Sequence, residues 1–169
     1  MELLKLAIED FDSFYSLIEE SFIEEERRDY SDALSLFREG KYEILKIVSD
    51  SKTVGFISLW HFPDFVFAEH FVTYKRYRNL GFGAEALSIL KERLGRIILE
   101  AEPATSDLTK RRLSFYKRNG FLENPEDYTQ PAYRKGASGV KLVIMSYPER
   151  LEGFEDTVTK IKRKVYSAF

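Results

Sequence analysis

Residues 78–83, with the sequence Arg-Asn-Leu-Gly-Phe-Gly, form the first of two short motifs whose residue types suit ligand binding. Gly81 and Gly83 allow the backbone to turn sharply and to come close to a bound group. The helix predicted to follow presents free N–H groups and the positive end of its dipole, a combination that favours a phosphate. A strand-to-helix turn without a ligand is the alternative interpretation of this motif taken alone.

Residues 115–121, Phe-Tyr-Lys-Arg-Asn-Gly-Phe, form the second motif. Its chemically useful residue is Tyr116. A phenol with an ordinary pKa near 10 is protonated at neutral pH, so it can give its proton to a leaving group. The alternative for Tyr116 is a packing role on a helix.

The hydrophobic pattern predicts the strands and helices that position these motifs. The expected strands are residues 3–8, a meander of 42–49, 53–60 and 65–73, a buried strand at 97–99 and a last strand at 140–147. The expected helices are residues 10–22, 32–37, 84–94 and 108–119. In this order the strands of the meander come first, followed by a helix–strand–helix unit and a last strand. Such an order predicts a mixed sheet with helices on both faces.

The two motifs, in this order and at this separation, resemble those of the GNAT superfamily of acetyl-CoA-dependent N-acetyltransferases. In that family an Arg/Gln-x-x-Gly-x-Gly/Ala loop cradles the pyrophosphate of coenzyme A, and a tyrosine ahead of a Gly-Phe pair lies near the thioester sulfur. The resemblance covers residues 41–147. It implies an α/β (α+β) fold with a GNAT-type mixed, mostly antiparallel central sheet. It also implies transfer of an acetyl group from acetyl-CoA to a primary amine by direct attack, without a metal.

The resemblance assigns residues to acetyl-CoA by position. Tyr116 matches the family's general acid. The residues assigned to coenzyme A are Phe71, Val72 and Thr73 at a strand end, then Arg78, Asn79, Leu80, Gly81, Phe82, Gly83 and Ala84, and finally Arg112 and Lys117 on the helix at 108–119. Many relatives carry an Asn just before this helix, but residues 102–107 contain none. Thr105, Thr109 and Arg112 are the candidates to replace it.

Attack by an amine needs a proton acceptor, and three glutamates are candidates. Glu100 ranks first, Glu69 second and Glu102 third, with the two that are not the base expected to be solvated or ion-paired. Burial near a partly apolar cleft raises the pKa of a carboxylate towards neutrality. His70 ranks below them, because strict alternation points it away from Glu69 unless a bulge reverses the parity of the strand. His61 is expected at the surface.

The acceptor side is expected to combine acidic and aromatic residues: Glu19, Phe22, Tyr128 and Tyr133. Carboxylates beside aromatic rings suit a small cationic amine. The alternative is that the charged run of residues 19–28 forms a solvated helix face with Glu–Arg pairs, as charge runs usually do.

The last segment, residues 151–169, has apolar residues spaced by three and four among several lysines and arginines. We expect residues 1–150 to form the acetyltransferase domain and 151–169 to form an amphipathic helix packed on it. The alternative is a basic helix that binds an anionic surface.

Composition narrows the possible partners. The chain of 169 residues contains no cysteine, two histidines and a formal net charge of −2, which argue against a zinc cluster, a disulfide framework and general nucleic-acid binding. No apolar run is long enough to span a membrane, and the first residues do not resemble a signal peptide. We therefore expect a cytoplasmic monomer or homodimer that acts on a small-molecule amine. The alternative is a GNAT-fold module that binds coenzyme A as a sensor or regulatory subunit, without turnover.

Overall fold

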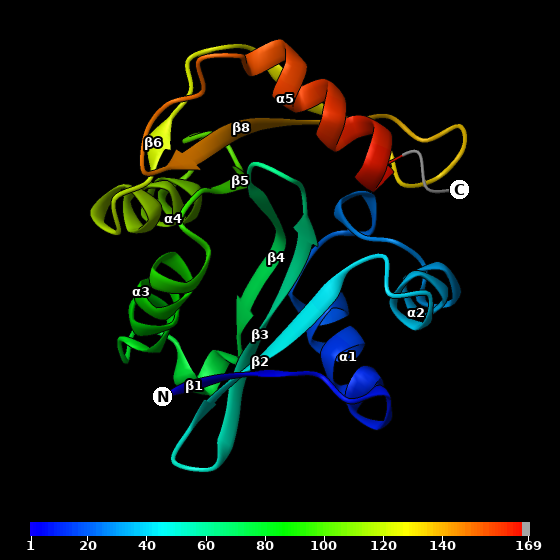
Figure 1. Ribbon diagram of the computed structural model, residues 1–169, viewed down its shortest axis with the longest axis vertical. Helices are drawn as coiled ribbons and strands as arrows, with labels where there is room; N and C mark the ends of the chain where they lie inside the picture. The colour runs from blue at the N-terminus through cyan, green and yellow to red at the C-terminus, as the bar shows by residue number, and fades with distance from the viewer. Residues whose placement is uncertain (167–169) are drawn as a thin grey trace.

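The computed structural model describes residues 1–166, which form one central sheet with helices on both faces (Figure 1). The strands are β1 (Glu2–Lys5), β2 (Glu43–Ser49), β3 (Lys52–His61), β4 (Val66–Thr73), β5 (Ile97–Ala101), β6 (Leu122–Glu123), β7 (Tyr128–Gln130) and β8 (Val140–Tyr147). The helices are α1 (Phe11–Ser21), α2 (Tyr30–Arg38), α3 (Phe82–Leu94), α4 (Asp107–Arg118) and α5 (Phe154–Ile161). Short 3₁₀ turns lie at Ile8–Asp10, Glu24–Glu26 and Lys75–Tyr77, and a π-helical turn follows α5 at Lys162–Tyr166.

The sheet has the order β1-β2-β3-β4-β5-β8-β6, and β7 pairs with the other end of β8. Every neighbouring pair is antiparallel except β4 and β5, which α3 connects as parallel strands. The predicted mixed, mostly antiparallel sheet is therefore confirmed. The short strands β6 and β7 were not predicted.

Strands β4 and β5 separate part-way along their length. Their pairing runs only from Val66 opposite Ile97 to Ala68 opposite Leu99. β4 continues to Thr73 and β5 to Ala101 without further pairing between them. One backbone edge of residues 69–73 thus lacks a neighbouring strand, and the sheet opens at this point.

A β-bulge lies where the two strands begin to separate. Leu59 pairs with Ala68 while Ser58 pairs with His70, so Glu69 is an extra residue in β4. A bulge reverses the side-chain alternation beyond it. Before the bulge Ala68 packs towards α3, and after it Phe71 packs on that same side. The bulge also brings Glu69 and His70 together beside one small cavity.

Two hydrophobic clusters cover the two faces of the sheet. The first contains the apolar faces of α1, α2 and α5 together with Trp60, Phe67 and Ile144. The second contains the apolar faces of α3 and α4 with Ile57, Leu99 and Met145. Figure 1 shows α1 and α2 on one side of β2–β4 and α3 on the other.

The C-terminal segment packs into the first cluster. Leu151, Phe154, Val158, Ile161 and Val165 are all buried there. Its basic residues also contact the rest of the chain, with Lys160 paired to Asp64 and Lys164 donating to the His61 carbonyl. The helix is not regular throughout the predicted range, because it widens into the π-helical turn at Lys162–Tyr166. Residues 167–169 of the predicted helix lie outside the described residues.

Candidate active site

The loop before α3 ends in a helix N-terminus that no side chain caps. Gly81 precedes the helix with φ +86°, and Asn79 also has a positive φ of 62°. These two left-handed residues turn the chain so that the first N–H groups of α3 lie free beyond the end of β4. Free N–H groups at a helix N-terminus bind anions such as phosphate. The loop therefore fits the pyrophosphate for which residues 78–84 were predicted.

Gly83 has a packing role that the motif did not predict. A Cβ atom at this position would lie 3.3 Å from Phe115 Cζ and 3.6 Å from Phe71 Cζ. The absence of a side chain thus allows α3 to approach the phenyl ring of α4. At Gly81, by contrast, a Cβ atom would meet nothing within 4 Å, and only the positive φ demands glycine.

Tyr116 lies on α4 next to Phe115, whose ring stacks on that of Phe71 in β4 at 6.2 Å. Its ring contacts Phe115 and Phe121 at centroid distances of 5.3 and 5.9 Å. Burial raises the pKa of Tyr116 to about 12, partly offset by the charge of Arg112. A phenol with this pKa remains a proton donor through the neutral range.

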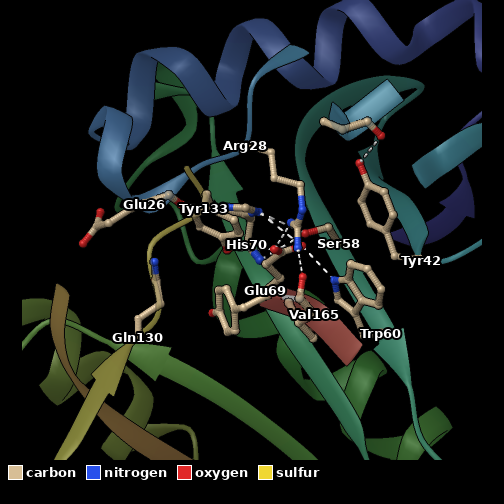
Figure 2. A network of polar contacts seen from close by, with 12 residues as sticks. Glu26, Arg28, Tyr42, Ser58, Trp60, Glu69, His70, Gln130, Tyr133 and Val165 are labelled. Carbon is tan, nitrogen blue, oxygen red and sulfur yellow. Dashed lines mark hydrogen bonds and ion pairs between the residues drawn. The ribbon is translucent and has the colours of Figure 1, made fainter. Parts of the chain in front are cut away.

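Glu69 is held in a buried network (Figure 2). Arg28 pairs with it, and both side chains are almost fully buried. Trp60 Nε1 and the Tyr133 hydroxyl each donate to its carboxylate at 2.8 Å. Burial alone raises the pKa of Glu69, but the charge of Arg28 and the hydrogen bonds from Trp60 and Arg28 outweigh it and lower the pKa below its ordinary value. A carboxylate so strongly paired is a poor proton acceptor, so the structure argues against Glu69 as the base.

His70 is also committed to structural contacts. Its Nε2 lies 3.1 Å from the Glu26 carbonyl, which can only accept, so Nε2 carries the proton. Nδ1 then accepts from the Ser58 hydroxyl at 3.3 Å, and that hydroxyl accepts from the His70 main-chain N–H. Burial lowers the pKa of His70, so the ring is neutral. The bulge places His70 beside the same cavity as Glu69, the alternative to strict alternation, and these contacts occupy both ring nitrogens.

Glu100 lies near the end of β5, across the opening from β4. The Tyr128 and Tyr166 hydroxyls donate to its two carboxylate oxygens, the second at 2.6 Å. Burial raises the pKa of Glu100 to about 7, with hydrogen bonds from the two tyrosines acting in the opposite direction and Glu69 and Glu26 adding to the rise. A carboxyl group that titrates near neutrality suits general base catalysis at physiological pH.

The loop before α4 shows what two of the three candidates to replace the family's Asn, Thr109 and Arg112, contact. Ser106 and Thr109 cap α4 reciprocally, and Thr109 Oγ1 also accepts from the Thr105 N–H at 3.1 Å. Thr109 is thus a helix cap, and its hydroxyl is not available as an Asn substitute. Arg112 forms an ion pair with Glu102 at the surface. Glu102 was the third candidate for the base.

Several other residues predicted for coenzyme A are buried or have partners within the protein. Val72 is buried in the core, and Arg78 donates to the Thr73 carbonyl at 3.2 Å. Lys117 pairs with Glu123 at 2.7 Å, and both of their side chains are partly exposed.

The residues predicted for the acceptor side fall into two groups. Tyr128 and Tyr133 are buried, and their hydroxyls bind Glu100 and Glu69. Phe22 packs its ring on His70 at 4.7 Å. Glu19 is half-exposed and pairs with Arg27 at 3.4 Å, which is the Glu–Arg surface pair that was its alternative.

Three residues of the site were missed by the sequence reasoning. Arg28 was included in a charge run interpreted as either an acceptor surface or a solvated face, yet it is buried. Trp60 and Tyr166 were treated as strand and helix residues without a polar role. The only signal for Trp60 and Tyr166 was that a tryptophan N–H or tyrosine O–H on a buried face needs a partner.

Comparison with known proteins assigns the family. The sequence model of the acetyltransferase (GNAT) family matches residues 8–121, more than half of the chain. The chain belongs to the GNAT family. A solved Bacteroides thetaiotaomicron protein described as a GNAT-family acetyltransferase is 30% identical, with all of both chains covered and a TM-score of 0.93. No curated protein matches the sequence significantly.

More distant GNAT structures share the fold alone. The Escherichia coli ribosomal-protein-S18-alanine N-acetyltransferase is 16% identical over 90% of this chain and 96% of its own, with a TM-score of 0.59. A Bacillus subtilis acetyltransferase in complex with coenzyme A is 16% identical over 86% of this chain and 95% of its own, with a TM-score of 0.57. Among residues 1–166 of this GNAT protein, no helix is long and apolar enough to cross a membrane. The same residues hold no group of three or more His, Asp or Glu side chains that could bind a metal ion.

Proposed function

We propose that this GNAT protein transfers an acetyl group from acetyl-CoA to a small cationic primary amine. The observation that carries the proposal is the opening between β4 and β5, with an uncapped helix N-terminus at one end and Glu100 across it. Residues 78–84 fit the pyrophosphate, and the unpaired edge of residues 69–73 fits the extended pantetheine arm through strand-like hydrogen bonds. Acetyl-CoA supplies a thioester whose acetyl carbon can be attacked and whose thiolate can leave.

Two residues have proton-transfer roles in this proposal. Glu100 takes one proton from the ammonium group of the acceptor, which leaves a neutral amine that can attack the acetyl carbon. Tyr116 gives its hydroxyl proton to the sulfur as the carbon–sulfur bond breaks. The nitrogen releases its second proton to solvent as the amide forms, and Tyr116 recovers a proton from solvent. A pKa of about 7 for Glu100 supports its role as proton acceptor at neutral pH, and a pKa of about 12 for Tyr116 supports its role as proton donor.

The proposed acceptor class rests on the charge around the opening. Glu26, on the turn between α1 and α2, has its pKa raised by burial and by the nearby charge of Glu102, with Arg112 acting in the opposite direction. A cationic group placed beside Glu26 would favour its ionised form and relieve the remaining repulsion. This favours an ammonium ion over a neutral or anionic acceptor.

A thiol-release assay with acetyl-CoA and a panel of amines tests the proposal. We expect coenzyme A release that depends on the amine, with diamines preferred over amino acids because the latter carry a carboxylate. A GNAT-fold module without turnover would bind acetyl-CoA and release no thiol with any amine. That result would reject the enzyme and leave the binding module.

A further inference from the structure

The turn at Lys162–Tyr166, hereafter the C-terminal turn, reaches both carboxylates of the site. Its Val165 carbonyl accepts from Arg28 Nη2, and Arg28 in turn pairs with Glu69. Its Tyr166 hydroxyl donates to Glu100 Oε2 at 2.6 Å. Figure 2 shows the Arg28, Glu69 and Val165 part of this arrangement. The C-terminal segment is therefore more than a cover for the hydrophobic core.

The hydrogen bonds at Glu100 fit its ionised form. Tyr128 donates to Oε1 and Tyr166 to Oε2, so each oxygen accepts one phenol hydrogen and keeps a further lone pair. Burial and the charge of Glu100 raise the pKa of both phenols, so neither loses its proton near neutrality. A protonated carboxyl group carries no negative charge and accepts these two hydrogen bonds more weakly, so the two donors favour the ionised form.

The position of Tyr166 is set by apolar packing. Val165 and Ile161 are fully buried, and the Tyr166 ring lies 5.1 Å from that of Tyr133. These contacts hold the ring in place whether or not the hydroxyl is present. The hydroxyl itself contributes to Glu100.

We propose that Tyr166 is a positioning residue that acts through Glu100, by holding its carboxylate in place and favouring the proton-accepting form. The inference rests on the proposed acetyl transfer, in which Glu100 is the base. It makes the C-terminal turn part of the site, although this turn lies well beyond the residues 8–121 that match the family.

Several other groups act on Glu100, and all of them remain when only the Tyr166 hydroxyl is removed. Glu69 on β4 and Glu26 before α2 raise its pKa, and Tyr128 on β7 lowers it. Tyr133, in the β7–β8 loop, is coupled to Glu100 by charge, and Lys162 lies 5.3 Å from the centre of the Tyr128 ring. The change Tyr166→Phe therefore isolates a single contribution.

The test follows the titration of Glu100 directly and through catalysis. Glutamate side chains carrying ¹³C at the carboxyl carbon are observed by NMR across pH, with Glu100→Gln identifying the signal. In Tyr166→Phe we expect the midpoint of this signal to rise by about one pH unit, because a hydrogen bond to the ionised form is lost. The acid limb of kcat/KM should rise by the same amount. 3-Fluorotyrosine at position 166, a stronger donor with the same ring, should lower both.

The matched control is Tyr42→Phe, which removes a buried tyrosine hydroxyl that donates to the Ala33 carbonyl instead. It should leave the midpoint of Glu100 where it is, even if the protein loses a similar amount of stability. An unchanged midpoint in Tyr166→Phe would overturn the proposal. So would a midpoint that moves while the acid limb of kcat/KM stays in place. A wild-type protein that binds acetyl-CoA but turns over no amine would instead reject the proposed function, and this separates the two failures.

Discussion

Arg28 and Glu69 form an ion pair inside the protein, with side chains that are 3% and 1% exposed. Arg28 comes from the segment between α1 and α2, and Glu69 is the extra residue at the bulge of β4. The pair therefore ties the helical layer to the point where the sheet opens. It also keeps one of the two strongly buried carboxylates of the site ionised and out of proton transfer.

Breaking this pair should be costly. Arg28→Met leaves the Glu69 carboxylate buried without its cation, and we expect the free energy of unfolding to fall by about 3–5 kcal/mol. Adding Glu69→Gln should restore part of this, since the amide removes the buried negative charge and its oxygen can still accept from either Trp60 or Tyr133, which donate to different carboxylate oxygens. Urea unfolding of the two single variants and the double variant measures the coupling. If Arg28→Met lowers the free energy of unfolding by less than about 1 kcal/mol, the pair is exposed to water and not buried.

The Arg28–Glu69 pair should also affect how the stability of the protein depends on pH in the acid range. The pKa of Glu69 is lower in the folded protein than in the unfolded chain. Its contribution is therefore fully present above the ordinary glutamate pKa and is lost as the pH falls through the lower folded value. Glu69→Gln, compared with wild type by melting temperature from pH 3 to 7, should show a shallower loss at acid pH.

Glu100 should have the opposite effect on stability and a direct effect on rate. Because its folded pKa of about 7 is above that of the unfolded chain, the folded protein binds more protons between these values and loses stability as the pH rises through them. Glu100→Gln should thus gain melting temperature relative to wild type at pH 8 more than at pH 5. Turnover at neutral pH should fall about a hundredfold.

The pH–rate profile separates these two effects for Glu100. In wild type, kcat/KM should rise through about pH 7 and then level off as the carboxylate forms. Glu100→Gln should lose this limb, and its deficit should shrink at high pH, where more of the acceptor amine is already neutral. Glu102→Gln is the control, since its carboxylate pairs with Arg112 at the surface. A Glu100 variant that keeps the wild-type profile would exclude Glu100 as the base.

Tyr116→Phe should lower turnover with little change in acetyl-CoA affinity, because only the proton for the leaving thiolate is lost. Among residues 1–166 the Tyr116 hydroxyl makes no hydrogen bond, so its removal leaves no partner unsatisfied and stability should barely change. Single-turnover rates and acetyl-CoA titrations measure the two effects separately. Wild-type turnover under conditions where chemistry limits the rate would leave Tyr116 with a packing role alone.

Acetyl-CoA should stabilise the fold by about 2.7 kcal/mol at a hundredfold excess over its dissociation constant. Gly81→Val should abolish most of this gain, because a β-branched residue does not tolerate the positive φ that aims the α3 N–H groups. Gly40→Ala is a matched control with a positive φ of 66° in a loop away from α3. It should lower the melting temperature but leave the ligand-induced shift intact. A substitution at Gly83 is a poorer test of ligand binding, because its Cβ atom would lie 3.3 Å from Phe115 Cζ and would disturb the packing of α3 on α4.

Most helices and strands could be predicted from local sequence patterns. The apolar runs of β2, β3, β4 and β8 and the three-and-four spacing in α1 and α3 depend on a few neighbouring residues. The two motifs that resemble GNAT sequences are likewise continuous segments. The sequence by itself therefore determined the fold class, the loop that fits coenzyme A and a short set of candidate acids and bases.

The choice among those candidates depended on tertiary contacts. Glu69 and Glu100 are both strand glutamates, and nothing in their neighbouring residues indicates that one meets Arg28 while the other meets Tyr128 and Tyr166. The partners lie between 28 and 66 residues away along the chain, and the bulge at Glu69 shifts the faces of every later residue in β4. The pKa of a buried carboxyl group is set by the charges and donors around it. Only the folded arrangement brings those groups together, so only the tertiary structure distinguishes the paired carboxylate from the one that titrates near neutrality.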